Sequence, residues 1–142
     1  MNSTFVNEIM SKNVLTIDKS VSLQEAAQNM NKLNIGCVIV TDGTKPLGII
    51  TERDFVRKIA AQDKQASLIP LSEIMSYKFR WVEPSTEIED AVQKMLNHNV
   101  RRLIVLEDGK LVGVITQTDL ADFLRSRLLI EGTVKNIESE KP

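Results

Sequence analysis

Two short motifs in this sequence combine a glycine, a threonine and an aspartate at one fixed spacing. One runs Gly-Ile-Ile-Thr-Glu-Arg-Asp and ends at Asp54, and the other runs Gly-Val-Ile-Thr-Gln-Thr-Asp and ends at Asp119. Thr51 and Thr116 fall at the ends of expected strands, and each aspartate falls in the first turn of the helix that follows. A carboxylate placed there can accept two hydrogen bonds, which suits the vicinal 2′ and 3′ hydroxyls of a ribose. The helix start adds free N–H groups and the positive end of the helix dipole.

The same spacing has a purely structural interpretation. Thr-x-x-Asp before an apolar run is a capping box, in which the two side chains only satisfy the first amides of a helix. Capping does not explain the glycines, Gly48 and Gly113, which weaken the strands that contain them. Close approach of another backbone or of a ligand would explain them. The residues alone leave both interpretations open.

The motifs recur because the whole sequence repeats with an offset of 65 residues. Glu-Ile-Met-Ser at 8–11 returns at 73–76, and between residues 6 and 56 there are 16 identities in 51 aligned positions. A repeat on this scale predicts two copies of one structural unit. One unit of about 60 residues leaves much of its apolar surface exposed to water, so the copies should cover one another in a single globule.

Each copy predicts the element order βαββα, an α+β fold in which the two copies pack with pseudo-twofold symmetry. Apolar residues at intervals of three and four predict the first helix, and Asp-Gly between two apolar runs predicts a hairpin. Ser22 with Glu25, and Thr86 with Glu89, have the spacing of helix-capping boxes. The expected strands cover residues 14–17, 37–40 and 47–50 in the first copy, and 79–82, 103–106 and 111–115 in the second. We expect repeats at residues 1–65 and 66–128, followed by a mobile tail at 129–142.

Composition excludes several classes of protein. No stretch approaches the roughly 20 apolar residues of a membrane span, and the first residues do not resemble a signal peptide, so we expect a cytoplasmic protein. Cys37 is the only cysteine and His98 the only histidine, so one chain offers no disulfide and no Cys/His metal site. The net charge of −1 makes nucleic-acid binding unlikely as the main task. No grouped nucleophile and base, phosphate loop or dinucleotide fingerprint indicates an enzyme.

Taken together, the chain resembles a tandem cystathionine-β-synthase (CBS) domain pair, the Bateman module, from about residue 6 to residue 124. The resemblance rests on the Glu-Ile-Met-Ser segments, the Ala-x-x-x-Met helices, the Val-Ile-Val and Leu-Ile-Val-Leu strands and the two Gly-x-x-Thr-x-x-Asp motifs. In that family the Thr and Asp hold the ribose of AMP, ADP, ATP or a related ligand. The resemblance therefore implies one cleft served by Thr51 and Asp54, and another served by Thr116 and Asp119.

The resemblance also points to residues for the base and the phosphates. The family lines its adenine slot near the first strand, which implies Val14 and Thr16 in one copy and Phe79 and Trp81 in the other. A strand face or a dimer contact is an equal alternative for the aromatic residues. Several members place a basic residue where this chain has Arg101 and Arg102, and Arg53 could also reach a phosphate, with solvated surface charge as the alternative for each. The first copy has Gly36 and Cys37 at those positions, so the two clefts should differ in affinity.

These observations predict a non-catalytic regulatory protein that senses adenosine-type nucleotides, without a cofactor, and acts on an unidentified downstream protein. The family commonly forms flat dimers with helices in the interface, so a homodimer is expected. The apolar positions around Met30, Phe55, Met95 and Phe123 are candidates for its contacts, with core packing as the alternative. Two other functions stay open: an interaction scaffold that binds no nucleotide, and a weak nucleic-acid binder.

Overall fold

The computed structural model describes residues 3–139, and the side chains of residues 3–132. The elements along the chain are α1 (Val6–Ile9), β1 (Thr16–Asp18), α2 (Leu23–Leu33), β2 (Cys37–Asp42), β3 (Lys45–Thr51), α3 (Glu52–Asp54), the π-helical turn η1 (Phe55–Ile59), the 3₁₀ turns η2 (Ala60–Gln62) and η3 (Ala66–Leu68), α4 (Leu71–Ile74), β4 (Trp81–Val82), α5 (Ile88–His98), β5 (Arg102–Glu107), β6 (Lys110–Thr116) and α6 (Gln117–Ser139). The expected βαββα order is confirmed in both copies.

Each copy forms a three-stranded sheet in which the first strand runs parallel to the second and the second antiparallel to the third. Gly48 lies opposite Val40, and Gly113 lies opposite Val105, so the two sheets share one register. The first strands are shorter than predicted. Their ladders start only where the carbonyls of Leu15 and Arg80 accept the first hydrogen bonds from the second strands.

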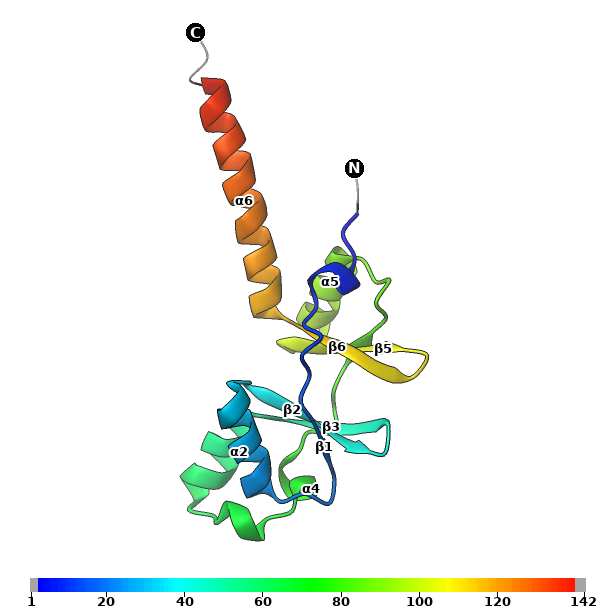
Figure 1. Cartoon of the computed structure of the whole chain (residues 1–142), viewed down its shortest axis with the longest axis vertical. Helices are drawn as coiled ribbons and strands as arrows, with labels where there is room; N and C mark the ends of the chain where they lie inside the picture. The colour runs from blue at the N-terminus through cyan, green and yellow to red at the C-terminus, as the bar shows by residue number, and fades with distance from the viewer. Residues whose placement is uncertain (1–2, 140–142) are drawn as a thin grey trace.

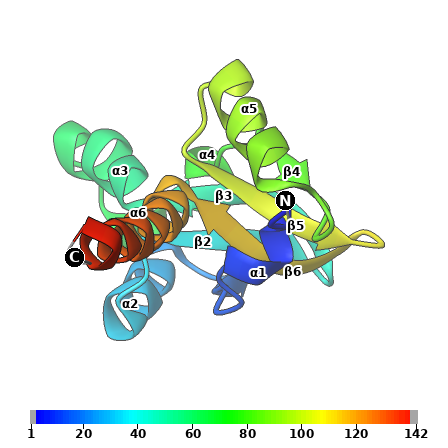
Figure 2. The same cartoon turned by 90° about the horizontal axis from the view of Figure 1, so that it is seen from above.

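The two sheets stack on one another, with α2 and α5 on their outer faces (Figures 1 and 2). Four buried residues, two from each copy, form the apolar layer between them: Ile39, Ile49, Ile104 and Val114. Side chains from both copies pack around this layer, including Val14 and Phe79. The expected single globule therefore has a core that joins the repeats.

The segments before the first strands are exchanged between the repeats. Val6, at the start of the chain, is fully buried in the core of the second copy, and α1 contacts β6 and α6. Conversely, Leu71, Ile74 and Met75 lie in the core of the first copy. The backbone confirms the crossing, because Ser11 pairs with Val114 and Ser76 pairs with Ile49. The repeats of the sequence are therefore not the two packed halves of the molecule.

One of the two predicted caps of the first helices is correct. Ser22 caps α2, since its hydroxyl accepts a hydrogen bond of 3.1 Å from the amide of Glu25. The Thr86–Glu89 box is wrong, because α5 begins one residue later and its N-cap is Glu87, whose side chain makes no cap hydrogen bond. The buried residues of both helices recur at intervals of three and four, as predicted: Leu23, Ala26 and Met30 in α2, and Ile88, Ala91 and Met95 in α5.

The last helix, α6, continues through the region expected to be a tail. It extends from Gln117 to Ser139 and projects away from both sheets, so it is seen almost end-on in Figure 2. The mobility expected from residue 129 onward stays a prediction, and residues 140–142 lie outside the described part of the chain. Among residues 3–139, no helix combines the length and the apolar character needed to cross a membrane.

Candidate functional site

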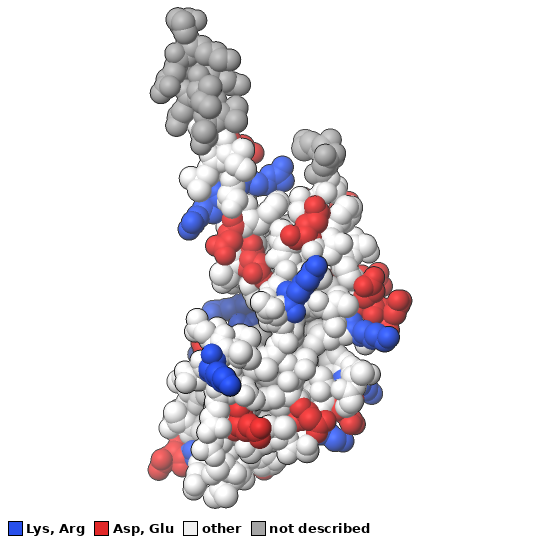
Figure 3. All heavy atoms as spheres, in the orientation of Figure 1, with Lys and Arg blue, Asp and Glu red and all other residues white. Residues whose placement is uncertain are grey.

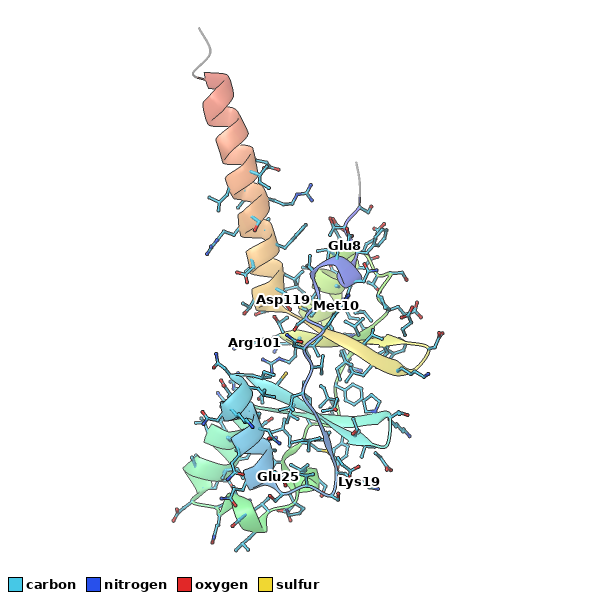
Figure 4. All side chains as sticks on the ribbon, viewed as in Figure 1. Glu8, Met10, Lys19, Glu25, Arg101 and Asp119 are labelled. Carbon is cyan, nitrogen blue, oxygen red and sulfur yellow. The ribbon has the colours of Figure 1, made fainter. Side chains whose placement is uncertain are left out.

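A cleft of about 520 Å³ lies between the two copies, at the end of β3. Thr51, Arg53 and Asp54 come to it from the first copy, and Phe79, Arg101 and Arg102 come from the second. Figure 4 shows Arg101 at the level where the two halves meet, below Asp119 at the start of α6. Six of the predicted site residues thus share one cleft, which we call the larger cleft.

The larger cleft carries more positive than negative side chains. Its basic residues are Arg53, Lys78, Arg80, Arg101 and Arg102, against the acidic residues Glu52 and Asp54. Sequence reasoning missed Lys78 and Arg80, although their positions beside Phe79 could have indicated them. The face in Figure 3 mixes acidic and basic side chains without a large patch of one sign.

A second cleft of about 250 Å³, the smaller cleft, lies at the corresponding end of β6. Thr116 and Asp119 line it together with Val14, Cys37 and Arg102. Arg102 is its only basic residue among those described, and Asp119 its only acidic one. The two clefts thus differ in size and in charge, and the expected difference in affinity stays a prediction.

Thr51 and Asp54 form the capping box that was the structural alternative for this motif. The amide of Thr51 donates to Asp54 Oδ2 at 2.9 Å, and the Thr51 hydroxyl lies 3.3 Å from the same oxygen. The other carboxylate oxygen, Oδ1, pairs with Lys58 Nζ at 3.1 Å. Both oxygens of Asp54 therefore already have partners within the chain.

Asp119 differs from Asp54 in this respect. The amide of Thr116 donates to Asp119 Oδ2 at 2.9 Å, and the amide of Asp119 donates to the Thr116 hydroxyl at 3.1 Å, which completes a capping box here too. In the described part of the chain, no hydrogen bond or ion pair involves Asp119 Oδ1. One oxygen at the smaller cleft thus keeps its capacity to accept hydrogen bonds.

The motif glycines have a structural cause. A Cβ on Gly48 would lie 2.9 Å from the carbonyl oxygen of Ser76, and a Cβ on Gly113 would lie 2.9 Å from that of Ser11 and 2.7 Å from Met10 Sδ. The exchanged segments cross the strands at these points, and Figure 4 shows the label of Met10 close to that of Asp119, at the start of α6. Of the two explanations left open by the sequence, approach of another backbone is the one the structure supplies.

Thr16 and Trp81 are not among the residues that line either cleft. Thr16 is the first residue of β1 and pairs with Ile39 of β2, and Trp81 is the first residue of β4 and pairs with Ile104 of β5. Lys94 Nζ stands 5.7 Å from the centre of the Trp81 ring and donates a hydrogen bond to the Trp81 carbonyl. Val14 and Phe79 precede these strands, pack against the apolar layer between the sheets and each line one cleft, so they are the better placed of the four predicted residues.

Arg102 and Cys37 occupy equivalent positions in the two repeats and lie close to one another. Burial raises the pKa of the Cys37 thiol, and the positive charge of Arg102 opposes that rise. The Nε atom of Arg102 is buried without a hydrogen-bond partner among the described residues. Among residues 3–132, whose side chains are described, no group of three or more His, Cys, Asp or Glu side chains could hold a metal ion.

Comparison with known proteins gives a consistent result. The family model described as "CBS domain" matches residues 6–61 and again residues 71–126. The CBS domain-containing protein YhcV of Bacillus subtilis is 34% identical over 116 residues, which cover 82% of each chain. The protein MK0525 of Methanopyrus kandleri is 37% identical over 122 residues, which cover 84% of this chain but only 62% of that protein. The chain therefore spans less than two thirds of the length of this second relative.

Among solved structures, the CBS domain pair of protein MJ0100 is similar over 89% of this chain and 99% of its own length. The TM-score is 0.79 and the sequence identity 28%. That structure contains 5′-methylthioadenosine and S-adenosyl-L-methionine.

Proposed function

This chain belongs to the CBS-domain family as a tandem pair of CBS domains, and we propose that it is a non-catalytic regulatory protein that senses adenosine-type nucleotides. The ligands proposed are AMP, ADP, ATP or a similar adenosine derivative, bound in the clefts between the repeats. The observation that carries this proposal is the larger cleft, where a Thr-Asp motif of one repeat faces a group of basic side chains from the other.

The chemistry of the larger cleft suits each part of a nucleotide. Its volume falls within the range of roughly 300–1,000 Å³ that is usual for small-molecule sites. Phe79 offers an aromatic surface to a base, and guanidinium groups bind phosphate through charged, often paired hydrogen bonds. A ribose diol at Asp54 would compete with Lys58 for Oδ1, whereas a diol at Asp119 would meet an unpaired oxygen.

The position of the larger cleft between the two repeats suits it to regulation. A ligand that contacts both repeats binds one arrangement of them better than another. It shifts the population of arrangements by that difference in affinity and no more. A downstream protein, still to be identified, would read the shift.

The test measures binding of AMP, ADP, ATP, S-adenosylmethionine and NAD by thermal shift, followed by calorimetric titration with AMP. We expect the double variant Asp54→Ala, Asp119→Ala to lose AMP binding. The matched control is Asp42→Ala, which breaks the exposed ion pair with Lys19 and touches neither cleft.

Because both aspartates also cap helices, a second pair of substitutions separates the two roles. Asp54→Asn with Asp119→Asn keeps an oxygen that can accept from the threonine amide, so the caps should survive. Loss of a cap costs about 0.5–2 kcal/mol in the free energy of unfolding, which urea titration detects. A folded double-alanine variant that binds AMP as wild type would show that the site is assigned incorrectly.

We also propose that the protein is a homodimer. Met30 and Met95 are 5% and 3% exposed, so these two candidate contacts belong to the cores. On α6, in contrast, Leu124, Leu128 and Ile130 are 56%, 58% and 64% exposed on a helix that projects from the globule. A second copy would cover apolar surface that this chain leaves in water.

Sedimentation analysis tests the dimer. Leu124→Glu with Leu128→Glu should convert it to a monomer, because the charges would have to be buried in the interface. Leu68→Glu, at a position 76% exposed in the connection between the repeats, should leave the mass unchanged. A dimer that forms without any response to nucleotides would favour the interaction scaffold instead.

A further inference from the structure

We propose that Arg102 couples the two clefts, so that an anionic nucleotide bound in one weakens the binding of an anionic nucleotide in the other. The coupling rests on the proposed function, since both clefts must bind nucleotides. It goes beyond that function by assigning to one side chain the communication between the two sites.

The first observation is that Arg102 is shared. Gly36 and Arg102 are the two residues that line both clefts, and Gly36 has no side chain to offer a ligand. Arg102 begins β5 and lies opposite Thr116 of β6, so its backbone is fixed beside the motif of the smaller cleft. Its guanidinium is therefore the side-chain group that ligands in both clefts can reach.

The second observation is that the guanidinium is not committed. Among the described residues, no hydrogen bond or ion pair involves the Arg102 side chain, and its Nε is buried without a partner. A buried donor without an acceptor is unfavourable, and a ligand phosphate is a strong acceptor. Turning the guanidinium toward either cleft breaks no hydrogen bond within the described protein, so either ligand can recruit it.

The third observation is the unequal supply of charge. The larger cleft has four other basic residues, whereas Arg102 is the one basic residue lining the smaller cleft in the described chain. The equivalent position in the first repeat is Cys37, which cannot replace it. A nucleotide in the larger cleft that draws Arg102 to its phosphate therefore leaves the smaller cleft without a cation. By thermodynamic reciprocity, a nucleotide in the smaller cleft weakens the larger one by the same factor.

Single-cleft variants supply the reference affinities. Asp119→Ala is expected to bind one AMP in the larger cleft, and Asp54→Ala one AMP in the smaller cleft, each measured by calorimetry. If the clefts are independent, the wild-type titration is the sum of the titrations of the two single-cleft variants. We expect the second AMP to bind the wild type with an affinity about tenfold lower than that of the same cleft in its single-cleft variant, within the usual range of coupling between sites.

Substitution of the shared residue should remove the deficit. Arg102→Gln is introduced into the wild type, into Asp119→Ala and into Asp54→Ala. The titration of Arg102→Gln alone should then equal the sum of the titrations of the two double variants. Arg101→Gln is the matched control, because Arg101 lines the larger cleft and not the smaller one. It should lower the affinity of the larger cleft and leave the coupling in place. Adenosine, which has no phosphate, should bind the smaller cleft equally well whether or not AMP occupies the larger one.

Three results would overturn the coupling: additive AMP binding in the wild type, a deficit that persists in Arg102→Gln, or an equal deficit for adenosine. Arg102→Met, which keeps the apolar stem, repeats the test if Arg102→Gln unfolds at a lower urea concentration. The absence of nucleotide binding in every protein would instead overturn the proposed function and the coupling with it. Additive binding overturns the coupling alone.

Discussion

At the scale of single residues, the Gly-x-x-Thr-x-x-Asp motif serves the fold before it serves a ligand. In both copies the threonine and aspartate complete a capping box, and the glycine admits an exchanged backbone segment. The basic residues that distinguish the two clefts lie mostly outside the motif: Lys78, Arg80 and Arg101 line the larger cleft alone, whereas Arg102 lines both. The fold requirements are thus met twice, while the basic side chains are divided unequally between the clefts.

The glycines provide a prediction at this scale. Gly48→Ala and Gly113→Ala should each lower the free energy of unfolding by about 1–3 kcal/mol, the usual cost of overpacking. The added Cβ would press on carbonyl oxygens at 2.9 Å, which a side-chain rotation cannot relieve. Urea denaturation measures the loss.

Gly132→Ala is the control, because nothing lies within 4 Å of its Cβ position in helix α6. There alanine should be neutral or stabilise by up to about 1 kcal/mol, through its higher helix propensity. Equal destabilisation at all three positions would contradict the explanation by close approach.

At the scale of elements, the exchanged segments carry each repeat into the core of the other. Leu71 is fully buried and belongs by sequence to the second repeat, yet it packs beneath the sheet formed by β1, β2 and β3. Val6 occupies the equivalent position beneath the sheet formed by β4, β5 and β6. Each sheet therefore depends on a helix that is remote in the chain.

A substitution at Leu71 tests this dependence. Leu71→Ala should cost about 2–5 kcal/mol, as large-to-small changes in cores do. Its local effect should appear in the opposite repeat: hydrogen exchange should accelerate in β1–β3 more than in β4–β6. Leu68→Ala, three residues earlier and exposed, should change stability by less than about 0.5 kcal/mol. Faster exchange confined to β4–β6 would contradict the exchange of segments.

At the scale of the whole molecule, three apolar clusters hold the chain together, and one of them contains residues of both sheets. The halves share an interface and also trade segments. The connection between them is consequently not needed to keep them together, since residues 63–65 lie exposed between the turns η2 and η3.

Cleavage of that connection gives the third structural prediction. With a protease site inserted between Lys64 and Gln65, the cut protein should elute as one complex and keep its circular dichroism spectrum. The fragment 1–65 produced alone should stay unfolded, because it lacks Leu71, Ile74 and Met75 from its core. Separation of the cut halves under native conditions would mean that the exchange contributes little to their association.

The sequence by itself determined the repeat, the order of strands and helices and the family, because these depend on local periodicity and on motifs within a few residues of one another. The spacing of the motifs pointed to the Thr-Asp pairs, and the resemblance to the family pointed to Val14, Phe79 and the three arginines; all of these residues line the two clefts. Only the tertiary structure decided that the segments before the first strands are exchanged between the repeats, that Thr16 and Trp81 lie outside the clefts, and that Arg102 lines both clefts. Those facts depend on how two remote, nearly equivalent surfaces pack, and no pattern within one repeat encodes which surface of the other it will meet.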